Sequence, residues 1–291
     1  MIQGTLLPEE HVKSRHLGSS RTIRVYLPPS YERSPRRRYP VLYLHDGQNV
    51  FSSAGSHACF GWGSWELDIT ADALAAGKKM REIIMVAVDN SRSRYREYRG
   101  PVAASTAQRQ RSDRDDLFQN YASFLIEELK PTIDRDHRTF RGPAHTALMG
   151  SSLGGICSVA LAWTHPKTFG AAASLSGSFQ IERNYFLQKV LRTYRREPKP
   201  IRIYLDSGTV DFDGDDDGRR HTKAIAAELR RIGWKDELSL KEFIDAPLKA
   251  GQLEKIGLRE SKWEEAQTSQ HNEFYWRHRA WRALTFLFPP K

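Results

Sequence analysis

A serine stands in a short turn of small residues, Gly150-Ser151-Ser152-Leu153-Gly154. An apolar run ending at Met149 precedes the turn and an apolar helical pattern follows it, so the turn is predicted to join a strand to a helix. A serine at such a sharp turn projects its hydroxyl above the sheet, and small neighbours let the backbone pass without a clash. The N-terminus of the helix adds partial positive charge beside a developing oxyanion. Ser152 is therefore a candidate nucleophile.

A nucleophilic serine needs a base to take its proton and a carboxylate to orient that base. The bare Gly-x-Ser-x-Gly spacing arises by chance in about one protein in ten of this length, so these partners decide its meaning. In an α/β sheet with its nucleophile on such a turn, the expected order along the chain is serine, acid, histidine. His221, His271 and His278 satisfy that order. His221 opens a predicted helix so soon after the candidate acids described below that no further strand can lie between them. His278 lies within a predicted helix. His271 lies in a loop before the last helix and is the predicted base.

The orienting acid is predicted in an acidic loop that follows a strand at 201–205. Asp211 comes soonest after that strand, through Gly208-Thr209-Val210, and is the predicted acid. The alternatives in the same loop are Asp213, Asp215, Asp216 and Asp217. The loop imitates the first half of a calcium-binding loop, but its twelfth position is Ala224 where a bidentate glutamate is needed. We interpret it as a solvated acidic loop and expect no metal or other cofactor.

Strands and helices alternate through most of the chain. The predicted strands are 39–44, 83–88, 170–175, 201–205 and 238–240, and the predicted helices are 66–76, 115–129, 219–232 and 272–287. Two further strands, 11–17 and 22–28, read as an N-terminal hairpin joined by Gly18-Ser19-Ser20. This alternation predicts an α/β fold, a mostly parallel central sheet with helices on both faces and an N-terminal antiparallel hairpin. The absence of internal repeats and of composition shifts predicts one domain over 1–291.

The composition excludes several classes of protein. The 291 residues are 39% hydrophobic and carry a formal charge of +10. No stretch approaches the roughly 20 apolar residues of a membrane span, and no N-terminal signal pattern is present, so we expect no membrane partner and a cytoplasmic protein, or a secreted one if a leader was removed. The two cysteines make no disulfide framework.

A basic run, Arg33 to Arg38, lies in a Pro-containing loop. No helix-turn-helix, zinc-finger or RNA-binding signature accompanies this run, so we interpret it as a solvated surface loop and expect no nucleic-acid partner. The positive charge of the chain favours acidic or anionic substrates.

Five segments together resemble the landmarks of one family. They are 39–51 (Tyr-Pro-Val-Leu-Tyr-Leu-His-Asp-Gly-Gln-Asn-Val-Phe), Asp89-Asn90 with Arg94 and Glu97-Tyr98, 150–155, 208–211, and His271-Asn272-Glu273 with Trp276. They are similar to segments of the α/β-hydrolase esterases that include feruloyl and acetylxylan esterases, enterochelin esterases and S-formylglutathione hydrolase. The landmarks extend from about residue 20 to 287, so the resemblance covers nearly the whole domain.

The resemblance implies a role for each matching residue. Ser152 would be the nucleophile, His271 the general base and Asp211 the acid that orients it. The backbone N–H of Leu153 would be one oxyanion donor, and the second would come from Gly47 or Gln48. One departure is that residues 245–270 are longer than this connection usually is in the family. They are either a lid or pocket wall or an ordinary surface insertion.

These features predict a serine carboxylic-ester hydrolase that works through an acyl-enzyme on a small-molecule or carbohydrate ester. An aromatic loop with Phe60, Trp62 and Trp65 is a candidate wall for an aromatic acyl group or a sugar face, the other interpretation being core packing. Two alternatives stay open. One is an acyltransferase of the mycolyltransferase type, and the other is a non-catalytic binding or scaffold protein on the same fold.

Overall fold

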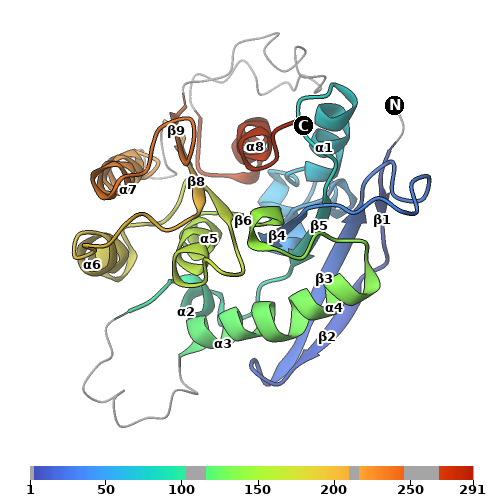
Figure 1. The fold of residues 1–291 in the computed structure, drawn as a ribbon, viewed down its shortest axis with the longest axis horizontal. Helices are drawn as coiled ribbons and strands as arrows, with labels where there is room; N and C mark the ends of the chain where they lie inside the picture. Colours follow the sequence, from blue (N-terminus) through green and yellow to red (C-terminus); the bar gives the residue numbers. More distant parts are fainter. Residues whose placement is uncertain (1–2, 103–115, 210–215, 246–268, 291) are drawn as a thin grey trace.

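The computed structural model describes residues 3–102, 116–209, 216–245 and 269–290. A nine-stranded sheet lies at its centre, with the order β1-β3-β5-β4-β6-β7-β8-β9 and with β2 paired to β3 (Figure 1). The strands are β1 (Thr5–Leu6), β2 (Glu10–Ser14), β3 (Ser19–Leu27), β4 (Val41–His45), β5 (Ile84–Val88), β6 (Thr146–Ser151), β7 (Ala171–Leu175), β8 (Arg202–Ser207) and β9 (Leu240–Ile244). The mostly parallel α/β sheet predicted from the sequence is confirmed.

Strands β4 to β9 run parallel, and the N-terminal strands β1 to β3 are antiparallel. Every residue of β4 and β5 is buried, as expected for continuous apolar strands covered on both faces. The predicted hairpin is present, but Ser14 pairs with Ser19, so its turn is 15–18. The Leu17 N–H donates to Ser14 Oγ and Gly18 takes a left-handed φ of 64°, which together close the turn earlier than predicted.

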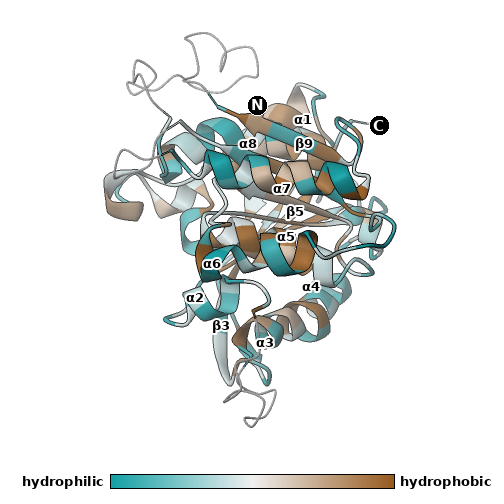
Figure 2. Ribbon diagram, turned by 90° about the vertical axis from the view of Figure 1, so that its left-hand side faces the viewer, coloured by the Kyte–Doolittle hydropathy of each residue, from teal (hydrophilic) through white to brown (hydrophobic). Residues whose placement is uncertain are grey.

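Helices cover both faces of the sheet. They are α1 (Leu67–Ala76), α2 (Arg94–Tyr98), α3 (Leu117–Ser123), α4 (Lys130–Asp136), α5 (Leu153–Thr164), α6 (Ile181–Tyr185), α7 (Arg219–Ile232) and α8 (Glu273–Leu287). Helices α1 and α8 pack together on one face, and α3, α4, α5 and α7 contribute to the core on the other (Figure 1). Helix α7 carries mostly hydrophilic residues, drawn in teal, on the side it turns toward the viewer in Figure 2. Its Ile225 and Leu229 are fully buried.

Two predicted elements differ in detail. The helix predicted from residue 115 is α3, a π-helical segment (Phe124–Leu129) and α4 in succession. The carboxylate of Asp116 caps its start by accepting a hydrogen bond from the Gln119 N–H. The last strand begins at Leu240, not at Leu238, because a turn in which the Leu240 N–H donates to the Lys235 carbonyl precedes it. Leu238 is consequently 69% exposed.

Both cysteines are free, and Cys157 is buried in α5 as predicted. Among the described residues, no helix combines the length and the apolar character that crossing a bilayer requires. The segment 246–268, which contains most of the predicted lid or insertion, lies outside the described residues.

Candidate active site

Ser152 lies at the tip of the turn between β6 and α5. Its backbone takes φ 52° and ψ −122°, a conformation that non-glycine residues rarely adopt. The Ser152 N–H donates to the Leu175 carbonyl on β7, and its own carbonyl accepts from the Ser178 N–H, both at 3.0 Å. A side chain at position 150 would bring a Cβ within 2.6 Å of the Gly154 backbone, so only glycine fits there. The sharp strand-to-helix turn predicted from the sequence is confirmed.

The N-terminus of α5 begins at Leu153, directly after the serine. Among the described residues, the Leu153 N–H and the Gln48 N–H donate to no backbone or side-chain acceptor. Gln48 lines the same pocket as Ser152, whereas Gly47 is buried against β5, where an added Cβ would lie 2.7 Å from Ala87. These two backbone donors therefore have no acceptor among the described residues.

An ion pair fixes the turn that carries Gln48. The guanidinium of Arg94 donates to both carboxylate oxygens of Asp46, at 2.6 and 2.7 Å, and the Asn90 side-chain amide donates to the same carboxylate. Asp46 has a left-handed φ of 57°, and its backbone N–H donates to Tyr98 Oη. Because a bidentate arginine holds a carboxylate in one orientation, the pair positions the start of the Gly47–Asn49 turn.

His271 stands in the loop before α8, as predicted, and lines the pocket with Ser152. Its Nδ1 lies 2.6 Å from Oδ1 of Asp217. The ring contacts Trp276 edge to face, with centroids 4.9 Å apart. A carboxylate on Nδ1 fixes the tautomer that leaves Nε2 as the basic nitrogen, which is the arrangement that a general base requires.

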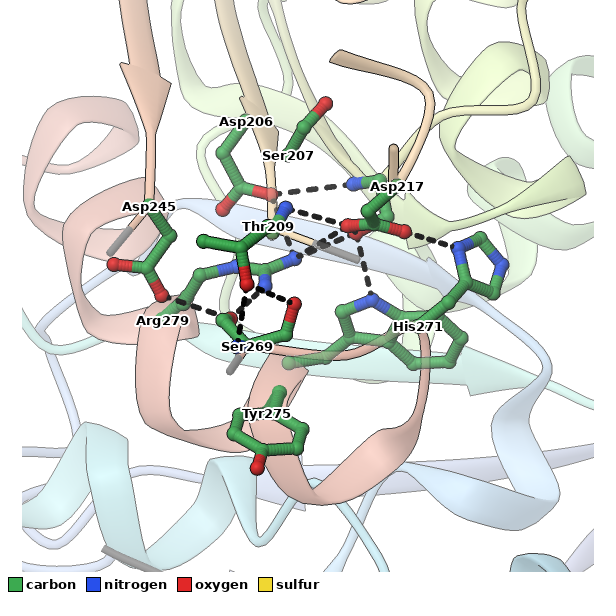
Figure 3. Close-up of polar contacts among 12 residues, drawn as sticks. Asp206, Ser207, Thr209, Asp217, Asp245, Ser269, His271, Tyr275 and Arg279 are labelled. Atoms are coloured by element: carbon green, nitrogen blue, oxygen red, sulfur yellow. Dashed lines mark hydrogen bonds and ion pairs between the residues drawn. The ribbon is translucent and has the colours of Figure 1, made fainter. Parts of the chain in front are cut away.

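Asp217 is fully buried, and its second oxygen is held by protein donors (Figure 3). Asp217 Oδ2 accepts from the Ser176 hydroxyl and from the Gly208 N–H. The guanidinium of Arg279, also fully buried, lies 3.8 Å away and pairs with Asp206 at 3.1 Å. Each oxygen of the buried carboxylate therefore has a polar partner, which holds Asp217 in one orientation against His271.

The described acid on His271 is Asp217, one of the alternatives that the sequence analysis left open. The predicted acid, Asp211, falls with Asp213 and Asp215 in 210–215, outside the described residues. The Gly208 N–H binds Asp217, so the chain returns to the end of β8 just before α7 begins. The number of residues after β8 does not show which aspartate comes back to the end of the strand. Asp217, which belongs to the calcium-loop pattern considered above, contacts His271. The described residues contain no group of three or more side chains that could hold a metal ion.

The pocket around Ser152 and His271 has a volume of about 690 Å³. Phe60, Trp62 and Trp65 all line it. Trp65 also packs in the core against Trp276, with centroids 5.9 Å apart, whereas Phe60 is fully exposed. Trp65 therefore contributes to the core, and Phe60 lies at the rim of the pocket.

Glu273 is a further carboxyl group in the pocket wall. Burial raises the pKa of Glu273 above its usual value. Its Oε1 accepts a hydrogen bond from the side-chain amide of Asn49 at 3.4 Å. The group stands at the start of α8, two positions after His271, so it can contact the same bound molecule as the histidine.

His45 is fully buried behind the nucleophile turn, with Nδ1 2.9 Å from Tyr121 Oη. Burial lowers the pKa of His45 to about 4, an effect that Arg94 reinforces and Asp46 opposes. The unfolded chain, with a histidine pKa of about 6.5, binds the proton more readily. The free energy of unfolding is therefore expected to fall as the pH drops from about 6.5 to 4, by up to about 3 kcal/mol from this group.

Urea unfolding at pH 7.5 and pH 5 measures this effect. His45→Gln is expected to lose part of the pH dependence, and the exposed His11→Gln is expected to keep it. Equal pH dependence in the wild type and His45→Gln would show that His45 does not titrate in this way.

Several of these residues were missed by the sequence analysis. The buried Arg279 was overlooked, although a charged residue on the same face as Trp276, Ala280 and Ala283 was a signal. Arg94, Asn90 and Glu273 were noted only as parts of landmarks, without roles. No sequence pattern indicated Ser178, whose hydroxyl lies 3.1 Å from that of Ser152, because the two residues are far apart in the sequence.

This sheet, with a serine on a strained strand-to-helix turn and a histidine before the last helix, defines an α/β-hydrolase fold. The model of the esterase family described as "Putative esterase" matches residues 14–287. The chain belongs to this family, which makes it a carboxylic ester hydrolase.

Individual relatives are distant. The chain is 24% identical to the uncharacterized protein YbbA of Bacillus subtilis over 78% of its length and 85% of that protein. It is 26% identical to an endo-1,4-beta-xylanase/feruloyl esterase of Xylanibacter ruminicola over 79% of its length, but covers only 28% of that longer protein. The structure of a ferulic acid esterase superimposes over the whole of both chains, with a TM-score of 0.68 at 18% identity. This last similarity concerns the fold.

Proposed function

We propose that the protein hydrolyses carboxylic esters through an acyl-enzyme formed on Ser152, with His271 as general base and Asp217 as its orienting acid. The observation that carries the proposal is the 2.6 Å contact of Asp217 with His271 Nδ1 at the pocket that Ser152 lines. The family membership supports the class of reaction.

In the first half-reaction His271 Nε2 takes the proton of Ser152 as Oγ attacks the ester carbonyl. The backbone N–H groups of Leu153 and Gln48 then donate to the oxyanion. Gln48 is the better candidate than Gly47 for the second donor because it lines the pocket. His271 returns the proton to the departing alcohol, and the acyl group stays on the serine. Water activated by the same histidine then releases the acid.

The substrate we propose is an ester with an aromatic acyl group. Phe60 and Trp62 offer aromatic faces to the pocket, and Glu273 and Asn49 offer hydrogen-bonding groups for a ring hydroxyl. The feruloyl-esterase relative supports this choice. The experiment is hydrolysis of p-nitrophenyl acetate, p-nitrophenyl butyrate, methyl ferulate, acetylated xylan and a catecholate siderophore.

Methyl ferulate is expected to have the highest kcat/KM of the natural-type esters, and its release of acid is expected to need no added alcohol. Preference for an aliphatic ester would contradict the substrate proposal alone. Product formation that depends on an acceptor alcohol would favour the acyltransferase alternative. If no ester were hydrolysed, the binding or scaffold alternative would replace the proposal.

Phe60→Ala tests the aromatic rim. Phe60 is fully exposed, so its truncation should leave the fold intact. An aromatic contact contributes about 0.5–1.5 kcal/mol, so kcat/KM for methyl ferulate is expected to fall about 2- to 12-fold while that for p-nitrophenyl acetate stays within about twofold. Leu238→Ala, which truncates another exposed apolar side chain, is the matched control. An equal loss on both esters would mean that Phe60 does not recognise the acyl ring.

A further inference from the structure

A second cavity, of about 810 Å³, is lined mainly by cationic and apolar side chains. The cationic residues are Arg36, Arg37, Arg38, Lys78 and Arg81. Three of them belong to the basic run that the sequence analysis interpreted as a solvated loop. The fold adds Lys78 and Arg81 to this run, both from the segment between α1 and β5.

The only carboxylate lining this cavity, within the described ranges, is already engaged. Glu82 accepts hydrogen bonds from the backbone and the hydroxyl of Ser30, and it pairs with Arg37. Arg38 donates to the Thr139 carbonyl. Glu82 thus neutralises one of the five cations, and the cavity keeps an excess of positive charge.

Arg81 differs from the other four cations of the cavity, which are exposed. It is half-buried, and in the described part of the chain it forms no ion pair. Its Nε is buried and has no hydrogen-bond partner in that same part. Burial lowers the pKa of Arg81, as expected for a charge that lacks a counter-charge. A buried donor without an acceptor costs about 1–3 kcal/mol in general, so an anion at this position would be favoured.

Apolar side chains form the rest of the wall. Pro40, Met80 and Phe140 contribute from the segments that precede β4, β5 and β6. Arginine guanidinium groups recognise phosphate oxygens in pairs, and an aromatic ring offers a surface for a planar or apolar group. The combination suits a molecule with more than one negative charge at one end and an apolar group at the other.

We propose that this cavity binds a small phosphate ester or diphosphate, with its phosphates on Arg81, Arg36 and Lys78 and its apolar group against Phe140. The site is separate from the active site. Pro40 and Arg81 precede the parallel strands β4 and β5, whereas Asp46 follows β4 at the opposite edge of the sheet. A five-residue strand spans about 17 Å, so one small molecule does not occupy both pockets.

Isothermal titration of the full chain with inorganic pyrophosphate, AMP and ATP tests the proposal at low salt. Wild type is expected to bind ATP at about one site per chain with a Kd below about 1 mM, more tightly than pyrophosphate. Arg81→Gln and Arg36→Gln are expected to weaken binding by about tenfold or more each, since each removes a charged hydrogen bond. Hydrolysis of p-nitrophenyl acetate should be unchanged in both variants.

Arg192→Gln is the control, since it removes one exposed positive charge elsewhere on the surface. If Arg192→Gln and Arg81→Gln weakened ATP binding equally, the effect would come from net charge alone, and the proposed site would be wrong. So would the absence of saturable binding of all three compounds up to about 10 mM. Binding of a duplex oligonucleotide without binding of ATP would assign the basic surface to nucleic acid instead.

Discussion

Ser152→Ala is expected to lower kcat for ester hydrolysis by about 10⁶-fold, because it removes the atom that forms the acyl-enzyme. The residual rate would come from binding and from the oxyanion donors, which the substitution leaves in place. Steady-state hydrolysis of p-nitrophenyl butyrate over a wide range of enzyme concentrations measures the loss.

Ser151→Ala is the matched control for this experiment, since it removes a hydroxyl one residue earlier in the same turn. The Ser151 variant is expected to stay within about tenfold of wild type, because Ser151 ends β6 and has no assigned role in the reaction. A similar collapse of both variants, with intact folding, would indicate that the turn and not the Ser152 hydroxyl carries the activity.

Asp217→Asn is expected to lower kcat by about 10⁴-fold. An asparagine can present its amide N–H to Nδ1 of His271, which favours the tautomer with its proton on Nε2. The histidine then cannot accept the proton of Ser152. The substitution keeps the size of the side chain, so circular dichroism and thermal unfolding of the variant should show a folded protein.

Two neighbouring acids make this prediction specific. Asp216→Asn changes the adjacent carboxylate, which accepts a weak hydrogen bond from the Arg220 N–H, and it is expected to retain activity within about tenfold. Asp211→Asn tests the acid that the sequence predicted. If Asp211→Asn caused the loss and Asp217→Asn did not, the contact of Asp217 with His271 would have no catalytic meaning.

The nucleophile turn could be predicted because its determinants are local. Gly150, Ser152 and Gly154 lie within one turn, and the apolar runs around them specify the strand and the helix. The position of His271 followed from a second local signal, the start of the last helix, where Asn272 caps by accepting from the Tyr275 N–H. Both predictions depended on neighbours in sequence.

The orienting acid could not be chosen in this way. Several aspartates follow β8, and the choice depends on where the backbone returns after 210–215. The Gly208 N–H and the Ser176 hydroxyl select Asp217, and Ser176 comes from the end of a different strand, β7. A contact between residues 41 positions apart leaves no pattern in a single sequence.

Charged side chains show the same limit of a single sequence. Arg279 is fully buried against Asp206, a partner on a distant strand. The arginines of the basic run at Arg33–Arg38 are exposed, as the interpretation of a solvated loop predicts, but Lys78 and Arg81, which line a cavity with three of them, come from a different part of the chain. The fold brings these charges together, and the local sequence does not show which of them meet.

Covalent labelling with a fluorophosphonate, followed by mass spectrometry of the digested protein, tests the central claim most directly. The account predicts one adduct per chain on the peptide that contains Ser152, no adduct in Ser152→Ala, and much slower labelling in Asp217→Asn. An adduct on Ser178 or on another residue, or no adduct in a folded protein that still hydrolyses esters, would contradict the assignment of Ser152 as nucleophile.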